Sequence, residues 1–363
     1  MKVGLNGLII DKKKAGIGNY AYNLIQNILK VGNHDYTVFF QEHLKEDFKG
    51  VSRKNYNGTY QRILDEQFCL LKEFRKFDLL HFMDYSSPLI DIKVPYIVTI
   101  HDLSFYRFPK CFTFGRRMIK KIIGPVSIKR AVKIIADSEN TRKDIVDLFS
   151  ADEQKVVVVY PGRSGFVRVT DTQKIQSVKE KYGIKGDYIL FVGTLEPRKN
   201  IERLLLAYRI LLNKNVKENL VIVGRTGWLY ERIFKTARDL GIEDRVCFTG
   251  FVEDEDMPAI YSGAKVFVYP SLYEGFGLPP LEAMECRVPV VVSDRSSLPE
   301  VVGSSGMYVD PYDENSIAEG IHKLLIDEEL RNNLSVAGLE RAKNFDWEKA
   351  AKRVVAIYDE VLG

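Results

Sequence analysis

Short apolar runs alternate with helical patterns along the whole chain, and this alternation limits the possible folds more than any other feature. In the first half, strands are predicted at residues 2–6, 36–40, 78–82, 96–101, 132–136 and 156–160. In the second half, they are predicted at 188–192, 220–223, 246–249, 266–269 and 288–292, with helices near 200–213, 228–240, 256–263 and 278–286. The runs are apolar without clean alternation, as in strands buried on both faces. Each half is therefore predicted to be a Rossmann-like α/β domain with a parallel sheet.

The length of 363 residues also suits two domains better than one. Apolar runs lapse between Gly162 and Gly186, so we predict domains at 1–165 and 166–345, followed by a helix in 346–363. Ligands of parallel sheets bind beyond the carboxyl ends of the strands, and two such domains face to face would form a cleft. The residues that directly follow the strands are therefore the candidate site residues.

Several classes of protein are disfavoured by composition. No stretch approaches the roughly 18 apolar residues of a membrane span, and no signal peptide is recognisable, so a cytoplasmic protein is expected. The four cysteines form no CxxC pair and the five histidines form no HExxH motif, so no metal is expected. Asp254-Glu255-Asp256 matches a DxD metal motif, but acids that precede a helical pattern also suit the helix dipole, and this second interpretation is preferred.

Charge is distributed unevenly along the chain. Residues 1–165 carry a net charge of +9 and residues 166–363 a net charge of −5, which suggests an anionic partner for the first half. Residues 107–133 contain nine basic residues and no acidic one, with apolar residues interleaved. A membrane-surface or lipid-diphosphate site has this composition, and so has a helix with a solvated basic face. Nucleic acid is a weaker alternative, because the pI is near 8.6 and no reading motif is present.

Two glycines, Gly16 and Gly18, follow the first predicted strand and open a helical pattern, after a loop with Lys12, Lys13 and Lys14. Glycines let backbone N–H groups approach a phosphate at a helix start, although they also simply permit a tight turn. The third glycine of a dinucleotide fingerprint is replaced by Ala21. Dinucleotide binding is therefore not predicted here.

Arg198 and Lys199 follow the first strand of the second half and precede a helix. Arginine offers a planar fork and lysine a point charge, so the pair suits a diphosphate, and solvated loop charges are the alternative. Glu274 ends a later strand before a glycine-rich turn, and Glu282 lies about two turns into the next helix. The turn predicts an anion site and the helical carboxylate a ribose contact.

His101 ends the predicted strand at 96–101, and Asp102 directly follows it. An imidazole in this position is placed to meet a substrate, with Asp102 orienting it or acting as an acceptor, whereas a histidine satisfied within the core is the alternative. Ser138 ends a strand and begins a helix, so it is predicted to be an N-cap.

Together these features resemble the retaining GT-B glycosyltransferases of family four (group 1), which include bacterial mannosyl- and rhamnosyltransferases of O-antigen and capsule assembly. The resemblance extends over nearly the whole chain. It rests on the Gly-Ile-Gly loop and on HDLSFYRFP at 101–109, ADSENTRKDI at 136–145, GTLEPRKNIERLLLAY at 193–208, LVIVG at 220–224 and YPSLYEGFGLPPLEAM at 269–284. Glu274 and Glu282 match the family's E-x7-E pair.

The resemblance implies a GT-B fold whose C-terminal helix returns to the N-terminal domain, and it assigns roles to the motif residues. The implied catalytic residues are His101, Arg198, Lys199 and Glu274. The implied donor-binding residues are Gly16, Gly18, Gly193, Gly224, Phe251, Glu274, Gly275, Phe276, Gly277, Leu278 and Glu282. The acceptor or a membrane would contact Asp102, Arg116, Arg117, Lys120 and Lys121.

The implied reaction transfers a hexose from a nucleotide-sugar, without metal or other cofactor, with retention of anomeric configuration. Mannose from GDP-mannose is the first expectation, and the acceptor is a saccharide or lipid-linked saccharide at the inner membrane face. A UDP- or dTDP-sugar transferase, a sugar-nucleotide epimerase or phosphorylase, and a non-catalytic scaffold are the alternatives.

Overall fold

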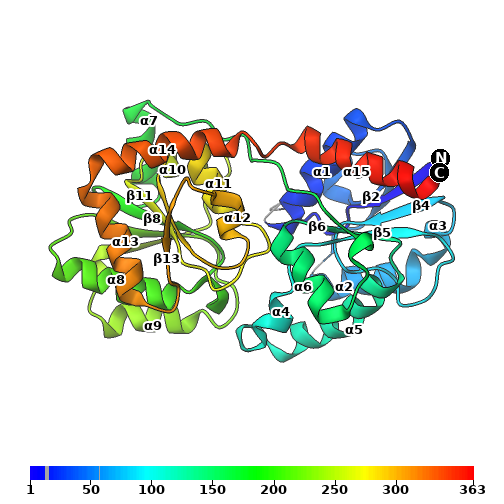
Figure 1. Cartoon of the computed structure of the whole chain (residues 1–363), viewed down its shortest axis with the longest axis horizontal. Coiled ribbons are helices and arrows are strands. Elements are labelled where there is room, and N and C mark those ends of the chain that lie inside the picture. Colours follow the sequence, from blue (N-terminus) through cyan, green and yellow to red (C-terminus); the bar gives the residue numbers. More distant parts are fainter. Residues whose placement is uncertain (13–15, 57) are drawn as a thin grey trace. The chain divides into compact units, whose positions relative to one another are not determined.

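A computed structural model describes residues 1–12, 16–56 and 58–363, with the side chain of Arg116 excepted. The chain divides into two compact units (Figure 1). Unit 1 contains residues 1–109, 113–162 and 345–363, and unit 2 contains residues 110–112 and 163–344. The predicted bounds of 165/166 and 345/346 lie close to these divisions.

Unit 1 is built on a seven-stranded parallel sheet in the order β3-β2-β1-β4-β5-β6-β7. Its strands are β1 (Lys2–Asn6), β2 (Asp35–Gln41), β3 (Gly50–Arg53), β4 (Leu79–Phe82), β5 (Tyr96–Ile100), β6 (Lys133–Ala136) and β7 (Val156–Val158). Its α-helices are α1 (Ile17–Val31), α2 (Thr59–Leu64), α3 (Leu71–Phe74), α4 (Ser104–Arg107), α5 (Phe114–Arg130), α6 (Glu139–Phe149) and α15 (Trp347–Leu362).

Unit 2 is built on a six-stranded parallel sheet in the order β10-β9-β8-β11-β12-β13. Its strands are β8 (Tyr188–Val192), β9 (Asn219–Val223), β10 (Val246–Gly250), β11 (Val266–Tyr269), β12 (Val290–Ser293) and β13 (Met307–Val309). Its α-helices are α7 (Thr172–Lys181), α8 (Ile201–Asn213), α9 (Glu231–Asp239), α10 (Met257–Ser262), α11 (Leu278–Glu285), α12 (Leu298–Val302), α13 (Glu314–Ile326) and α14 (Glu328–Ala342).

Both sheets are doubly wound, and this topology confirms the predicted Rossmann-like fold. In each, strand order reverses beside the first strand, between β1 and β4 in unit 1 and between β8 and β11 in unit 2. The crevice at such a reversal is where ligands of open α/β sheets bind. Two strands escaped prediction, β3 and β13. Both are short edge strands, of four and three residues, so neither forms a long apolar run.

The C-terminal helix α15 packs against α1 in unit 1, which confirms the predicted return. Val354 and Ile357 of α15 belong to one buried core with Leu24 and Ile28 of α1. The Tyr358 hydroxyl lies 2.6 Å from Nδ1 of His81 in β4, and burial lowers the pKa of this imidazole to about 3. A neutral, fully buried histidine therefore ties the last helix to the centre of the sheet.

Candidate active site

In unit 2, the predicted cations and the first predicted carboxylate meet at the point where strand order reverses. Arg198 and Lys199 lie in a 3-10 turn, Pro197–Lys199, that follows β8. Glu274 follows β11, which neighbours β8 in the sheet. The turn is held beside the segment after β11 because the Leu272 N–H donates to the Arg198 carbonyl at 2.9 Å. Parallel pairing of β8 and β11 thus brings together residues 75 positions apart.

The three side chains form one buried ionic cluster with Glu196. The Arg198 guanidinium donates to Glu274 Oε2 at 2.9 Å, to Glu196 Oε1 at 2.7 Å and to the Tyr273 carbonyl at 2.6 Å. Lys199 Nζ donates to Glu274 Oε1 at 2.8 Å and to the Tyr269 hydroxyl at 2.5 Å. Two cations therefore face two carboxylates, and both cations are directed by fixed partners.

The electrostatics of this cluster favour its ionised form. Burial alone would raise the pKa of the Glu274 carboxyl, but the charges of Arg198 and Lys199 hold it below its usual value. Burial lowers the pKa of Lys199, and Glu274 opposes that shift. An incoming dianion could take the place of the carboxylates on Arg198 and Lys199, because both cations donate to anionic oxygens already.

Three predicted glycines have a conformational reason to be glycine. Gly224 follows β9 with φ 147°, and a Cβ there would lie 2.0 Å from the Gly193 carbonyl oxygen. Gly193 has φ 159° and donates its N–H to the Val223 carbonyl. Gly277, at φ 124°, is the N-cap of α11, so the backbone N–H groups at the start of that helix follow the glycine-rich turn. Predicted donor residues Gly275, Phe276 and Leu278 belong to this same turn and helix start, and Phe251 directly follows β10.

Two serines that the sequence interpretation overlooked hold this turn. Ser297 Oγ lies 3.0 Å from the Glu274 carbonyl oxygen and 2.5 Å from the Phe276 carbonyl oxygen. The Glu274 N–H donates to Ser296 Oγ at 2.9 Å. Glu196 and Tyr269 are further partners, and although both lie within the quoted motifs at 193–208 and 269–284, the sequence interpretation gave neither a role.

Glu282, the predicted ribose ligand, lies on α11, and its hydrogen-bond partners are not members of the ionic cluster. Its two oxygens accept from Ser164 Oγ at 2.8 Å and from the Tyr261 hydroxyl at 2.7 Å, and burial raises its pKa. The neighbouring Glu285 accepts from Arg163 Nη1 at 3.1 Å and from the Gly165 N–H at 2.9 Å. One face of α11 therefore grips residues 163–165.

In unit 1, the predicted histidine is held by two acceptors. His101 Nδ1 lies 2.6 Å from Asp137 Oδ2, and Nε2 lies 2.7 Å from the Met83 carbonyl oxygen. Burial would lower the pKa of the imidazole, but Asp137 raises it above its usual value. A protonated ring satisfies both acceptors, so in this arrangement His101 acts as a buried donor that links β5, β6 and the segment after β4. Asp102 accepts from the Ser104 N–H and hydroxyl at 3.0 and 2.6 Å.

The glycine loop of unit 1 is described in part. Gly16 is the N-cap of α1 with φ 56°, and Gly18 is buried in the first turn. A Cβ at Gly18 would make only ordinary contacts, 3.6 Å from the Ile10 backbone. Lys13 and Lys14 of this loop lie outside the described residues. Ser138 accepts from the Thr141 N–H at 3.0 Å, which confirms the predicted N-cap of α6.

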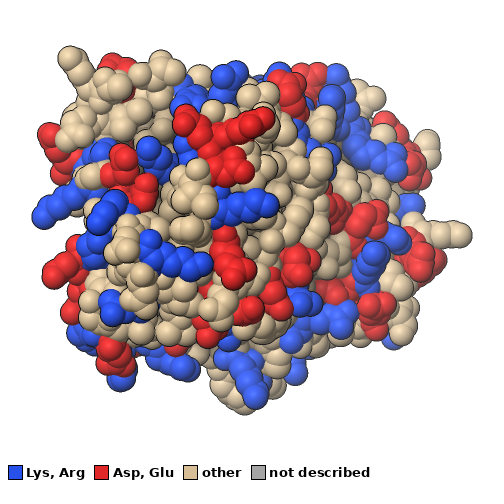
Figure 2. All heavy atoms as spheres, turned by 60° about the vertical axis from the view of Figure 1, so that its left-hand side comes forward, with Lys and Arg blue, Asp and Glu red and all other residues tan. Residues whose placement is uncertain are grey.

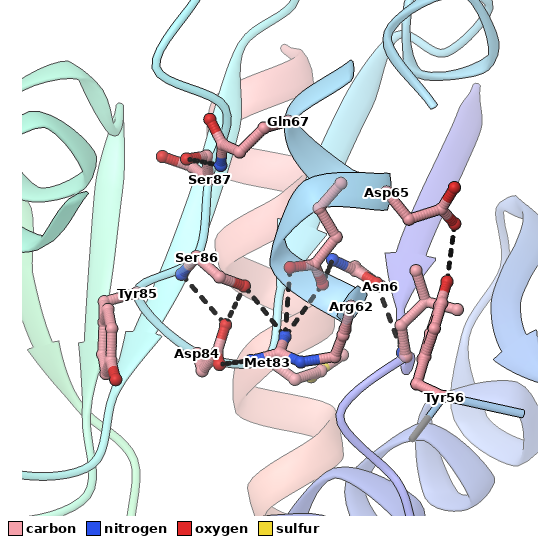
Figure 3. Close-up of polar contacts among 12 residues, drawn as sticks. Asn6, Tyr56, Arg62, Asp65, Gln67, Met83, Asp84, Tyr85, Ser86 and Ser87 are labelled. Atoms are coloured by element: carbon pink, nitrogen blue, oxygen red, sulfur yellow. Dashed lines mark hydrogen bonds and ion pairs between the residues drawn. The ribbon is translucent and has the colours of Figure 1, made fainter. Parts of the chain in front are cut away.

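A second ionic cluster, which the sequence interpretation missed, lies at the strand reversal of unit 1 (Figure 3). Arg62 of α2 donates to Glu66 Oε1 at 2.9 Å, to Asp84 Oδ2 at 2.9 Å and to Ser86 Oγ at 3.1 Å. Asn6, at the end of β1, donates to the same Glu66 oxygen at 2.9 Å. The guanidinium and both carboxylates are buried. Burial raises the pKa of the Glu66 carboxyl to about 7, with Arg62 opposing.

Most of the basic segment predicted at 107–133 forms α5, whereas Arg107 ends α4, Lys110 lies in a 3-10 turn and Lys133 begins β6. Arg117 is half-buried, Lys121 is exposed, and Lys120 Nζ lies 4.9 Å from the centre of the Phe105 ring. The side chain of Arg116 lies outside the described residues.

Across the residues that the structure describes, no cluster of three or more His, Cys, Asp or Glu side chains suits a metal ion. Asp256 of the DxD sequence pairs with Lys181 at 2.6 Å. No helix among the described residues is long and apolar enough to cross a bilayer.

Structural comparison places the chain in the GT-B class of glycosyltransferase fold. Sucrose-phosphate synthase from Thermosynechococcus elongatus superposes with a TM-score of 0.79 at 20% identity, over 99% of both chains. HepE from Anabaena, in complex with UDP and glucose, superposes with a TM-score of 0.79 at 17% identity, over 99% of this chain and 100% of that one.

Sequence comparison assigns the family. Residues 15–164 match the model "Glycosyltransferase Family 4" and residues 173–341 the model "Glycosyl transferases group 1". O-antigen chain mannosyltransferase B from Escherichia coli is 31% identical over 94% of this chain and 95% of that protein. Serotype-specific mannosyltransferase WbdA from the same species is 34% identical over 64% of this chain and 29% of its own length. The protein belongs to glycosyltransferase family 4 and resembles its mannosyltransferase members.

Proposed function

We propose that this glycosyltransferase moves a mannosyl residue from GDP-mannose to a saccharide or lipid-linked saccharide, with retention of anomeric configuration, in the synthesis of a cell-surface polysaccharide. The observation that carries the proposal is the Arg198–Lys199–Glu274 cluster at the strand reversal of unit 2. The relatives named as O-antigen mannosyltransferases support the choice of sugar.

The proposed mechanism uses this chain's cations on the leaving diphosphate. As the bond between the anomeric carbon and the phosphate oxygen breaks, negative charge grows on the diphosphate. Arg198, Lys199 and the N–H groups at the start of α11 would stabilise that charge, as pre-organised donors do in other transferases. The acceptor oxygen bonds to the anomeric carbon on the same face, and its proton passes to the leaving phosphate oxygen.

Glu274 and Glu282 take separate roles in this proposal. Glu274 orients both cations and meets the donor's sugar or phosphates, whereas Glu282 accepts hydrogen bonds from the ribose hydroxyls. Two cations on the diphosphate would replace the role of a metal ion. Transfer is therefore expected to persist in EDTA, and the product's anomeric configuration, read by NMR, is expected to match the donor's.

The deciding experiment is a thermal-shift panel of GDP, UDP, dTDP and ADP with their common sugar conjugates. A ligand at 100 times its dissociation constant stabilises the folded protein by about 2.7 kcal/mol. We expect GDP and GDP-mannose to raise the melting temperature most. A larger shift with UDP or dTDP would mean that the donor is a UDP- or dTDP-sugar instead of GDP-mannose. No shift with any of these ligands would favour a non-catalytic scaffold.

Acceptor dependence separates the transferase from an epimerase. Incubation with the donor alone is expected to leave its sugar unchanged, because the transferase needs an acceptor hydroxyl. Conversion of the donor sugar without acceptor would identify an epimerase instead.

We also propose that the protein works at the inner face of the plasma membrane.

A further inference from the structure

The segment 59–69 in unit 1, formed by α2 and a following π-helical turn (Asp65–Cys69), has its polarity inverted. Its exposed large apolar side chains are Tyr60, Leu64 and Phe68, at 59%, 59% and 64%, and Thr59, Gln61 and Cys69 are exposed beside them. Its buried side chains are polar or charged, namely Arg62, Asp65, Glu66 and Gln67. A helix that faces water normally has the opposite arrangement. The outward face is therefore suited to an apolar partner.

The inner face of this segment is fixed in place by the polar residues. Arg62 joins Glu66 to Asp84 in the loop after β4, and Gln67 Nε2 donates to the Ser87 carbonyl at 3.1 Å (Figure 3). Asp65 accepts from Arg53 Nε at 2.8 Å. The segment cannot rotate its apolar side inward without breaking these buried ion pairs. Exposure of the three apolar side chains is thus built into the fold.

A second outward apolar row lies on α5. Phe114, Met118 and Ile122 are spaced four residues apart, so they share one face of the helix, and they are 70%, 38% and 53% exposed. The two rows meet, because a Cβ placed on Gly115 would lie 3.3 Å from the Tyr60 hydroxyl oxygen. Both rows therefore belong to one surface of unit 1, which we call the α2–α5 surface.

The loop after β4 links the far ends of the two rows. The Leu89 N–H donates to Gln67 Oε1 at 2.7 Å, and the Leu89 carbonyl accepts from Arg130 Nη1 at 2.6 Å. Leu89 and Ile90 are also exposed. Of the 17 large hydrophobic side chains exposed in the described part of the chain, eight lie between residues 60 and 122. Single exposed apolar residues need no explanation, but such a concentration marks an interaction surface.

The charges of this surface select the partner. Both acidic residues of segment 59–69 are buried and paired with arginines, Asp65 with Arg53 and Glu66 with Arg62. Residues 107–133 contain no acidic residue, and Lys121, Lys129 and Arg130 are exposed. The face drawn in Figure 2 shows basic and acidic side chains interspersed.

We propose that the α2–α5 surface docks on an anionic lipid bilayer, with Tyr60, Leu64, Phe68, Phe114, Met118 and Ile122 entering the interfacial layer. Apolar side chains flanked by lysine and arginine are the chemistry that binds such a surface. A second copy of the chain fits less well, because pairing this surface with itself brings like charges together. The inference deepens the proposed function by naming a partner for unit 1, and it can be tested without any transfer reaction.

The test is sedimentation of the full chain with vesicles of phosphatidylcholine alone or mixed with phosphatidylglycerol. We expect binding to the mixed vesicles that weakens with salt, because surface charges are screened. The double variant Leu64→Gln/Phe68→Gln should lose at least about tenfold in partition coefficient, since each large side chain gains more than a tenfold preference when fully buried. Ile326→Gln and Val336→Gln alter exposed apolar residues of unit 2 and should bind as the unaltered protein does.

Two results would overturn the proposal: no binding to the mixed vesicles at low salt, or equal binding by the double variant. Light scattering tests the alternative that the surface binds a second copy of the chain. A dimer that the double variant abolishes would assign the surface to that second copy. The thermal shift with GDP-mannose, measured without vesicles, reports separately on the proposed function and on folding of each variant. Failure of one proposal is therefore distinguishable from failure of the other.

Discussion

The two units place different ionic clusters at the same topological position of their sheets. Unit 2 has two cations, Arg198 and Lys199, facing two carboxylates. Unit 1 has one cation, Arg62, facing Glu66 and Asp84. The first cluster can exchange carboxylates for a dianion. The second has two carboxylates for one cation, and it fastens α2 to the segment after β4.

This difference shows that the same sheet topology can hold ionic clusters of different charge balance at the point where strand order reverses. The cluster of unit 2 is charge-balanced, because Arg198 pairs with Glu196 and Glu274, and Lys199 pairs with Glu274. The cluster of unit 1 holds α2 so that its apolar side faces outward. Three measurements test the contrast, each with a matched control variant.

The largest effect, a loss of folding stability, is expected from Arg62→Met in unit 1. Removal of one partner from a buried ion pair leaves Glu66 and Asp84 uncompensated, and such changes destabilise by about 3–5 kcal/mol. The sequence contains two tryptophans, Trp228 and Trp347, and only the latter lies in unit 1. In a Trp228→Phe background, urea unfolding followed by fluorescence therefore reports on unit 1.

The matched control is Arg75→Met, an exposed arginine of the same unit, which should change the midpoint little. An Arg62→Met protein as stable as this control would show that the cluster contributes nothing to unit 1.

Arg198→Ala in unit 2 should slow the reaction while the unit stays folded, because Lys199 still pairs with Glu274. Loss of one donor to developing charge typically slows transfer by about 10²–10³-fold. The measurement is the transfer rate from GDP-mannose, with circular dichroism as the check on folding. Arg209→Ala alters an exposed arginine of α8 and should keep the normal rate. A near-normal rate in Arg198→Ala would remove this residue from the site.

The smallest effect concerns how the folding stability of unit 1 changes with pH through Glu66. Burial raises the pKa of Glu66 from 4.5 to about 7 in the folded state. The folded protein therefore binds more protons than the unfolded chain between these values, so this group's stabilisation is present below about pH 4.5 and is lost as pH rises to about 7. In the Trp228→Phe background, Glu66→Gln should flatten that decline, by up to about 1.4 kcal/mol per pH unit.

Unit 2 supplies the control for this prediction, because burial raises the pKa of Glu285 to about 7 against the opposing effect of Arg163. Glu285→Gln should leave the pH dependence of the Trp347 signal unchanged. An unaltered slope in Glu66→Gln would show that this carboxyl does not titrate between the two pH limits.

The outcome of the sequence predictions differs between local and distant features. The strands at 2–6, 188–192 and 266–269 were predicted to the residue, and the helix Trp347–Leu362 within one residue at each end, because each is a continuous apolar or amphipathic run. The short edge strands β3 and β13 were missed, since three or four residues at a sheet edge carry little periodicity. Arg62 and Glu66 were also missed, because four-residue spacing of opposite charges on a helix usually marks a solvated face.

The sequence by itself determined the class of fold, the two-domain plan and the residues after β8 and β11 that carry charge, because these are properties of local pattern and motif. Only the tertiary structure decided which charges meet. It paired Arg198 with Glu274, placed Glu282 against Ser164, and buried Arg62 while exposing Leu64 and Phe68. Each of these depends on strand order and helix packing between residues distant in the chain, and a charged side chain looks the same in sequence whether its partner is water or a buried carboxylate.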